Sequence, residues 1–190
     1  DEKPFSTVEP GDFYSESSQI EAAFAASLNS LWDSWSGYGY GMGAFVHDDQ
    51  YYGGDLVIGS NHGSNLWRVH YNAILNLNAA IRSINKEKLP EVSDSDIDVL
   101  MGQGKFLRGF NYFMLVRMFG GVPLIVEDTP DPVSNPVKRS SIAEVYDLII
   151  RDFKEAAQKL PRKWDEDRKG RPTSGAAKGF LAKAYLTMAT

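Results

Sequence analysis

The side chains best suited to chemistry gather in residues 34–65. This stretch is poor in aliphatic residues, and six aromatic rings are interleaved there with glycines: Trp35, Tyr38, Tyr40, Phe45, Tyr51 and Tyr52. An aromatic face can stack on the apolar face of a pyranose ring, while Asn, Asp and His side chains hold hydroxyl groups. We therefore predict a ligand-binding site formed by Tyr38, Tyr40, His47, Asp48, Tyr51, Tyr52 and Asn61. The alternative is that several of these rings cover the helical core.

Histidines within and just after this stretch offer candidate metal ligands. His47 stands beside Asp48 and Asp49, and His62 and His70 follow. A zinc protease needs two histidines at fixed helical spacing with a glutamate between them, and this sequence has no such spacing. We expect polar loop residues that fix a turn, and no metal.

An acidic string imitates the start of a calcium-binding loop. Asp94, Asp96 and Asp98 occupy its first ligand positions, but Val99 stands where glycine is needed and Lys105 where a bidentate glutamate is needed. Carboxylates are also favoured at the positive end of a helix dipole. We therefore expect this string to begin a helix.

Two further motifs overlap near residue 170. Residues 165–170 begin another calcium-like loop, but its twelfth position is Ala176, so calcium there would need side chains from elsewhere and is left open. Residues 170–175 (GRPTSG) imitate a phosphate loop, with Ala176 in place of the essential lysine. We expect Arg171 and Lys178 to be charges at a buried edge that pair with neighbouring helices.

The acidic residues after residue 140 do not suggest catalysis. Glu144, Asp147, Asp152 and Glu155 lie away from the apolar stripe of their helix, so we interpret them as solvated surface charges. No Ser-His-Asp arrangement stands out, and the absence of cysteine excludes thiol chemistry. We predict that the protein is not an enzyme and needs no cofactor.

Composition limits the partners further. The chain has 190 residues, with 20 Lys and Arg against 25 Asp and Glu, which gives a net charge of −5. Scattered basic residues among more numerous acids argue against a nucleic-acid partner. Hydrophobic residues make up 43% and charged residues 24%, which is typical of a folded globular protein. No apolar run approaches the roughly 20 residues that span a bilayer.

Helices must position these groups, because apolar residues recur at helical spacing and strand-like alternation is scarce. We predict an all-α fold with five helices, in the approximate ranges 18–35, 64–86, 96–119, 141–160 and 175–190. Ser18 with Glu21, and Ser141 with Glu144, have the spacing of capping boxes. Residues 127–139, which carry three prolines, are predicted to be a linker.

The third and last helices have unusual faces. The third is apolar on nearly every side in its later half, which is typical of a helix surrounded by others. The last is still apolar and periodic at Thr190, with Leu181, Ala184, Tyr185 and Met188 facing a partner surface. We therefore expect a single helical domain over residues 1–190, the N-terminal part of a longer protein.

The last two helices resemble tetratricopeptide repeats, in which small residues let paired helices approach. The matching residues are Phe153, Ala156 and Pro161 in one helix and Leu181, Ala182 and Tyr185 in the next. A polar loop separates the two helices, so these repeats are irregular.

A more specific resemblance covers most of the chain. Four ordered blocks resemble the helical core of the SusD/RagB family of nutrient-binding outer-membrane lipoproteins: WRVHYNAILNLNAAI, KFLRGFNYFMLVRMFGGVPLI, RSSIAEVYDLIIRDFKEAAQKLP and GRPTSGAAKGFLAKAYL. In the first block Trp67, Tyr71, Ile74 and Asn78 are in register with the family. Most of the matched residues belong to the scaffold and not to a site.

The resemblance implies a function and a location. It implies non-catalytic capture of an oligosaccharide or polysaccharide nutrient and its delivery to a SusC-like TonB-dependent transporter. It also implies a lipid anchor on the outer membrane, with the protein exposed at the cell surface; the anchoring cysteine is missing here, which we attribute to processing or trimming. The alternative is a tetratricopeptide-type adaptor that binds a protein or peptide in a helical groove.

Overall fold

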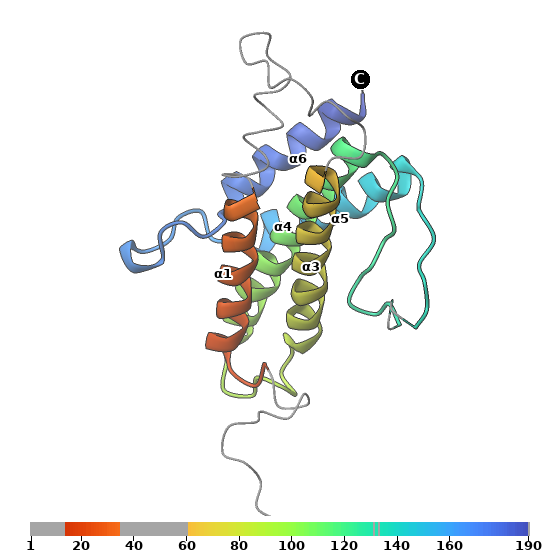
Figure 1. Ribbon diagram of the computed structural model, residues 1–190. Helices are drawn as coiled ribbons and strands as arrows, with labels where there is room; N and C mark the ends of the chain where they lie inside the picture. The colour runs from red at the N-terminus through yellow and green to blue at the C-terminus, as the bar shows by residue number, and fades with distance from the viewer. Residues whose placement is uncertain (1–13, 35–60, 131, 133, 190) are drawn as a thin grey trace, which may run out of the picture.

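The computed structural model describes residues 14–34, 61–130, 132 and 134–189, and the regular structure in these ranges is helical (Figure 1). Its α-helices are α1 (Ser17–Ser34), α3 (Asn61–Ser83), α4 (Asp94–Phe119), α5 (Ile142–Lys159) and α6 (Ser174–Met188). A short 3₁₀ helix, η2 (Glu166–Arg168), precedes α6. The described ranges contain no β-strand beyond one isolated bridge, so the predicted all-α fold is confirmed. None of their helices is long and apolar enough to cross a membrane.

Helix α4 is the centre of the bundle and contacts each of the other four described α-helices. Leu107, Tyr112, Phe113 and Leu115 are fully or almost fully buried on it, as its apolar sequence predicted. Helices α3 and α4 can pack closely because residue 104 of α4 is glycine. A Cβ at this position would lie 2.8 Å from Cγ1 of Ile81 on α3. Helix α3 packs against both α1 and α4.

Capping explains where two of the helices begin. Ser141 and Glu144 form the predicted capping box of α5, in which each side chain accepts the other residue's backbone N–H. Ser93 caps α4 by accepting the Asp96 N–H at 3.1 Å, with Asp94 and Asp96 in the first turn. The acidic string therefore begins a helix, as expected.

The capping box predicted at the first helix is wrong. Helix α1 begins one residue earlier than predicted, so Ser18 lies within its first turn and donates its hydroxyl to Glu16 at 3.1 Å. Glu21, the expected partner of Ser18, instead pairs with Arg171, which is 150 residues away. A tertiary ion pair thus replaces a local cap.

Residues 122–140, of which 131 and 133 are not described, connect α4 to α5. The described part contains no helix, as predicted for a linker, and forms a loop that is closed at its base (Figure 1). Gly120 ends α4 with φ 71°. Gly121 lets the two ends of the loop approach each other, because a Cβ at this position would lie 2.2 Å from the Ser140 carbonyl oxygen. An isolated antiparallel bridge joins Pro123 to Arg139, and the Ser140 N–H donates to Val122 O at 3.1 Å.

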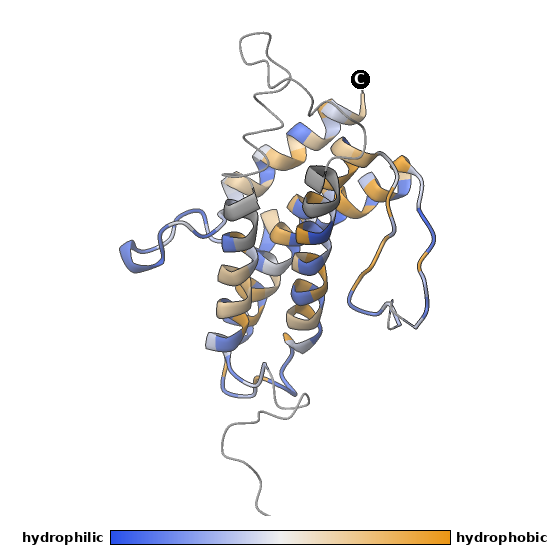
Figure 2. Ribbon diagram, in the orientation of Figure 1, coloured by the Kyte–Doolittle hydropathy of each residue, from blue (hydrophilic) through white to orange (hydrophobic). Residues whose placement is uncertain are grey.

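The polar loop before α6 is held at its base, although its sequence is strongly hydrophilic (Figure 2). Trp164 Nε1 donates to Pro172 O at 2.8 Å, and the Arg171 guanidinium lies 5.5 Å from the centre of the Trp164 ring. Arg171 also pairs with Glu21, which confirms its predicted role. Lys178 is exposed, so its predicted place at a buried edge is wrong.

Candidate functional site

The predicted ligand-binding loop lies outside the described residues. This holds for Tyr38, Tyr40, His47, Asp48, Tyr51 and Tyr52, whereas Asn61 opens the backbone of α3 and only its side chain is outside them. The structure does describe what flanks the loop: the C-terminal end of α1 and the N-terminal end of α3 lie at the same end of the bundle (Figure 1). In the sequence, the predicted site residues therefore come after α1 and before or at the start of α3, and these two helix ends lie at the same end of the bundle.

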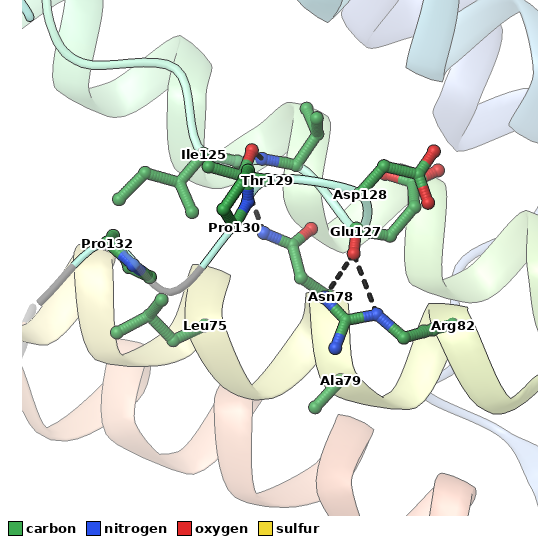
Figure 3. Close-up of a pocket in the computed structure, with 11 residues that line it drawn as sticks. Leu75, Asn78, Ala79, Arg82, Ile125, Glu127, Asp128, Thr129, Pro130 and Pro132 are labelled. Atoms are coloured by element: carbon green, nitrogen blue, oxygen red, sulfur yellow. Dashed lines mark hydrogen bonds between the residues drawn. The ribbon is translucent and has the colours of Figure 1, made fainter. Parts of the chain in front are cut away.

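A pocket of about 580 Å³ lies between α3 and the first half of the 122–140 loop (Figure 3). Helix α3 contributes Leu75, Asn78, Ala79 and Arg82, and the loop contributes residues 125–130 and Pro132. Its lining mixes aliphatic and proline side chains with an amide, a guanidinium, a hydroxyl and carboxylates. The volume and the mixed lining are those of a small-molecule pocket.

Hydrogen bonds hold the loop side of this pocket in place. Asn78 Nδ2 donates to Ile125 O at 2.8 Å, and the Tyr112 hydroxyl both donates to Ile125 O at 2.8 Å and accepts the Ile125 N–H at 2.7 Å. Arg82 Nε donates to Glu127 O at 2.7 Å, and its Nη2 donates to the same carbonyl. The backbone of residues 125–127 is therefore fixed to α3 and α4.

A buried ion network lies beneath the pocket. Arg108 and Asp152, both 0% exposed, form a bidentate pair with Nε···Oδ2 at 2.7 Å and Nη2···Oδ1 at 2.8 Å. Arg108 Nη1 donates to Asn78 Oδ1 at 3.0 Å and also to Glu127. Lys105 Nζ lies 2.6 Å from the other oxygen of Glu127. The network joins α3, α4, α5 and the loop.

The network changes the protonation of its members. Burial alone would raise the pKa of the Glu127 carboxyl, but the charge of Arg108 and hydrogen bonds from Lys105 and Arg108 lower this pKa to about 2. Burial alone would likewise lower the pKa of the Arg108 guanidinium, but bonding to Asp152 and the charges of Asp152 and Glu127 raise it. Both side chains are therefore charged at neutral pH.

This network overturns one prediction from the sequence. Asp152 was expected to be a solvated surface charge, but it is fully buried on the face that α5 turns toward α4. Glu127, in the predicted linker, binds two cations of α4. The α5 sequence carries no signal for this, because the partner of Asp152, Arg108, lies 44 residues away. An arginine in the apolar later half of α4 was the one available hint.

An apolar pocket of about 470 Å³ lies between α1, α4 and α6. Phe110, Phe113 and Phe180 line it, with Trp32 at its rim, where 75% of that residue is exposed. Phe110 is only partly buried and meets Phe180 edge to face with 5.2 Å between ring centres. Arg117 and Lys183 are the charged residues of the lining.

The described residues contain no group of three or more acidic or histidine side chains that could hold a metal ion. His70 is buried, and its Nδ1 lies 2.9 Å from Asn111 Oδ1. Burial lowers the pKa of the His70 imidazole, and the bond to Asn111 opposes that shift only in part. His70 is therefore a neutral core residue. His47, Asp48 and Asp49, and the side chain of His62, lie outside the described residues.

Comparison with protein families gives a match over residues 19–186. The matching family model is SusD-like and is described as starch-binding, associating with outer membrane. A SusD-like protein of Bacteroides ovatus is 28% identical over 98% of this chain, and the SusD-like protein P2 of Formosa agariphila is 26% identical over 98%. The chain spans only 35% and 39% of the length of these two relatives.

Comparison with solved structures also gives SusD-like proteins. A laminarin-binding SusD-like protein is 34% identical, with a TM-score of 0.60 over 65% of this chain and 26% of its own. A structure containing a xylogluco-oligosaccharide is 28% identical, with a TM-score of 0.73 over 88% of this chain and 34% of its own. The fold is also that of a SusD-like protein from Bacteroides fragilis, with a TM-score of 0.74 over 97% of this chain and 37% of its own, at 24% identity.

Family model, relatives and fold agree over nearly the whole chain, so this protein belongs to the SusD-like family of carbohydrate-binding proteins.

Proposed function

We propose that this chain binds a neutral glycan nutrient at the outer membrane and passes it, unchanged, to a SusC-like TonB-dependent transporter. The observation that carries the proposal is the family match over residues 19–186. Similarity to a laminarin-binding protein and to a structure holding a xylogluco-oligosaccharide supports a glycan as the ligand. The family description supports the outer membrane as the location, where a lipid anchor would hold the protein at the cell surface.

The chemistry of two carboxylates near the first pocket, the partly buried Glu127 and the fully buried Asp152, supports binding without catalysis. A glycosidase needs a general acid with a raised pKa and a second carboxylate free to act as nucleophile or base. Glu127 has a lowered pKa and two cationic partners. Asp152 is bound bidentately by Arg108. Both groups therefore serve the scaffold.

We place the main ligand contacts of this chain on the aromatic loop, at Tyr38, Tyr40, His47, Asp48, Tyr51, Tyr52 and Asn61. Glycines let the backbone approach a ligand, and tyrosines offer flat faces with little rotational entropy to lose. A shallow stacking surface shared with hydroxyl contacts is expected to give an affinity no tighter than about micromolar.

Affinity electrophoresis of the chain in gels containing laminarin, xyloglucan or starch tests the proposal. We expect retardation by at least one polysaccharide, with an affinity that stays nearly constant between low and high salt, because a neutral ligand offers no charge to screen. If no polysaccharide in the panel retards the chain while a purified SusC-like transporter binds it, the adaptor alternative replaces the glycan proposal.

The loop is tested by replacing two adjacent rings. The double change Tyr51→Ala and Tyr52→Ala is expected to weaken glycan binding at least about tenfold, or ~1.4 kcal/mol, with unchanged helical circular dichroism. Tyr185→Ala, at an exposed tyrosine of α6, is the matched control and is expected to bind as the unaltered chain does. Full binding by the double variant, and also after loss of Tyr38 and Tyr40, would place the site elsewhere.

A further inference from the structure

We propose that the pocket between α3 and the loop residues 125–130 and Pro132 is a second glycan subsite, which takes one pyranose unit and recognises a pair of adjacent hydroxyl groups. The choice of a sugar as ligand rests on the proposed function. The location and the chemistry rest on the pocket itself, whose residues are all described and lie apart from the aromatic loop in the sequence.

Arg82 supplies the donors. Of the five N–H groups of its guanidinium, two point to the Glu127 carbonyl, and three remain for a ligand. Among the described residues, no carboxylate forms an ion pair with Arg82, and the neutral Glu127 carbonyl oxygen is the acceptor of its hydrogen bonds. Figure 3 shows Arg82 reaching from α3 to the loop backbone, which fixes the fork in one orientation.

Asp128 and Thr129 supply the complementary groups. The Asp128 side chain is exposed at the pocket, and within the described ranges it takes part in neither an ion pair nor a hydrogen bond. The Thr129 hydroxyl oxygen accepts the Val126 N–H at 2.8 Å, which leaves its hydrogen free to be donated. A carboxylate accepts hydrogen bonds from two adjacent hydroxyl groups, and a guanidinium donates to their oxygens, so this set fits a vicinal diol.

The remaining lining suits the carbon side of a sugar ring. Leu75, Ile125, Pro130 and Pro132 contribute apolar surface. The volume of about 580 Å³ is ample for one pyranose ring. Because no aromatic ring of the described residues lines this pocket, stacking by them contributes little, and the hydroxyl contacts have to decide which sugar binds.

The pocket is formed before any ligand arrives. Its loop wall is fixed by Asn78 and Tyr112, and Asn78 is itself held by Arg108 of the buried ion network. A preformed wall lowers the entropic cost of binding. Even so, one ring with few contacts is expected to bind with a dissociation constant on the order of millimolar.

NMR titration of the full chain with methyl β-D-glucopyranoside tests the proposal. We expect saturable shifts of the Leu75 methyl signals and of the Thr129 amide signal. The 3-deoxy analogue lacks both vicinal pairs of this sugar, and it is expected to bind about tenfold more weakly. Equal affinity for the sugar and its 3-deoxy analogue would overturn the proposed recognition.

Asp128→Asn removes the acceptor charge from an exposed position and is expected to weaken binding of the same sugar about tenfold. Asp147→Asn, at an exposed aspartate of α5, is the matched control and is expected to change nothing. Arg82→Lys keeps the charge but loses the planar fork, so it too is expected to weaken binding. Unchanged affinity of the Asp128→Asn variant, or no shift at Leu75 and Thr129 up to roughly 100 mM sugar, would overturn the subsite.

The test separates this subsite from the proposed main site. The double variant Tyr51→Ala, Tyr52→Ala is expected to bind polysaccharide at least about tenfold more weakly and to keep the Leu75 shifts with methyl β-D-glucopyranoside. If no polysaccharide binds the chain but the pocket titrates as expected, the proposed function fails and the subsite stands. If polysaccharide binds but the pocket gives no shift, the subsite alone is refuted.

Discussion

At the scale of single residues, the fold depends on a charged group in its centre. Arg108 is fully buried and meets two carboxylates, one from α5 and one from the 122–140 loop. Such a group is costly to bury and becomes far costlier when a partner is removed, because an unpaired charge then remains in the core. The network therefore makes three elements dependent on one side chain.

Removal of one partner is expected to show this dependence. Asp152→Ala leaves Arg108 short of its bidentate acceptor, and we expect a loss of about 3–5 kcal/mol in the free energy of unfolding, measured in urea. Replacing both residues, with Arg108→Met and Asp152→Leu, is expected to recover much of that loss because no lone charge remains. A cost below about 1 kcal/mol for Asp152→Ala would contradict the assigned role of the pair.

The lowered pKa of Glu127 predicts how stability depends on pH. Its pKa is about 2 in the folded chain, against 4.5 as the ordinary value. Because the folded pKa is the lower one, the unfolded chain takes up a proton first, so this stabilisation is complete above pH 4.5 and is lost as the pH falls toward 2. Thermal unfolding from pH 6 to pH 2 measures the loss.

A variant isolates the Glu127 part of that loss. Glu127→Gln is expected to have a lower melting temperature at pH 6 and a flatter decline below pH 4.5 than the unaltered chain. Glu91→Gln, at an exposed site, is expected to retain the full decline. Identical acid curves for the Glu127→Gln variant and the unaltered chain would show that Glu127 does not titrate as described.

At the scale of elements, glycines within helices have opposite roles. Gly104 lies where α4 touches α3, and a Cβ there would stand 2.8 Å from Ile81 Cγ1 and 3.3 Å from Phe24 Cζ. A Cβ at Gly179 of α6 would meet no atom within 4 Å. Helix propensity favours alanine at both positions, so only the packing distinguishes them.

The same substitution is therefore expected to have opposite effects. Gly179→Ala should raise the free energy of unfolding by about 0.5–1 kcal/mol. Gly104→Ala should lower it by about 1–3 kcal/mol, because the crowded core has to move. Urea unfolding of both variants makes the comparison, and stabilisation by both would mean that α3 and α4 pack less closely than described.

At the scale of the whole molecule, apolar side chains remain exposed on α1 and α6. Trp32 is 75% exposed and Leu186 71%, and Tyr185 and Met188 are about half exposed. This confirms the predicted exposed face of the last helix in part, since Ala184 is buried and Leu181 partly buried. Exposed apolar groups favour association.

Self-association of the 190-residue chain at high concentration is the expected consequence. Leu186→Lys should lower the associated fraction in sedimentation velocity, because it puts a charge into the exposed apolar face. Leu75→Lys, at a leucine of α3 that is 39% exposed, is the control and is expected to associate as the unaltered chain does. A strictly monomeric unaltered chain would count against this prediction.

The sequence alone determined the helices and the family. Helices α4, α5 and α6 were predicted to within two residues at their beginnings, and the Ser141–Glu144 box was found, because caps and apolar periodicity depend on residues at most four positions apart. The ligand-binding loop from Tyr38 to Asn61 was also derived from composition, and it stays a prediction because it lies outside the described residues.

Only the tertiary structure decided where the charges lie. The spacing of α5 places Asp152 off its apolar stripe, and the sequence cannot show that α4 covers that face as well and brings Arg108 to it. Glu127 and the pocket beside Arg82 depend in the same way on α3, α4 and the loop meeting in space. Local periodicity tells which residues share a face, but packing between distant segments decides whether a polar face meets water or a buried partner.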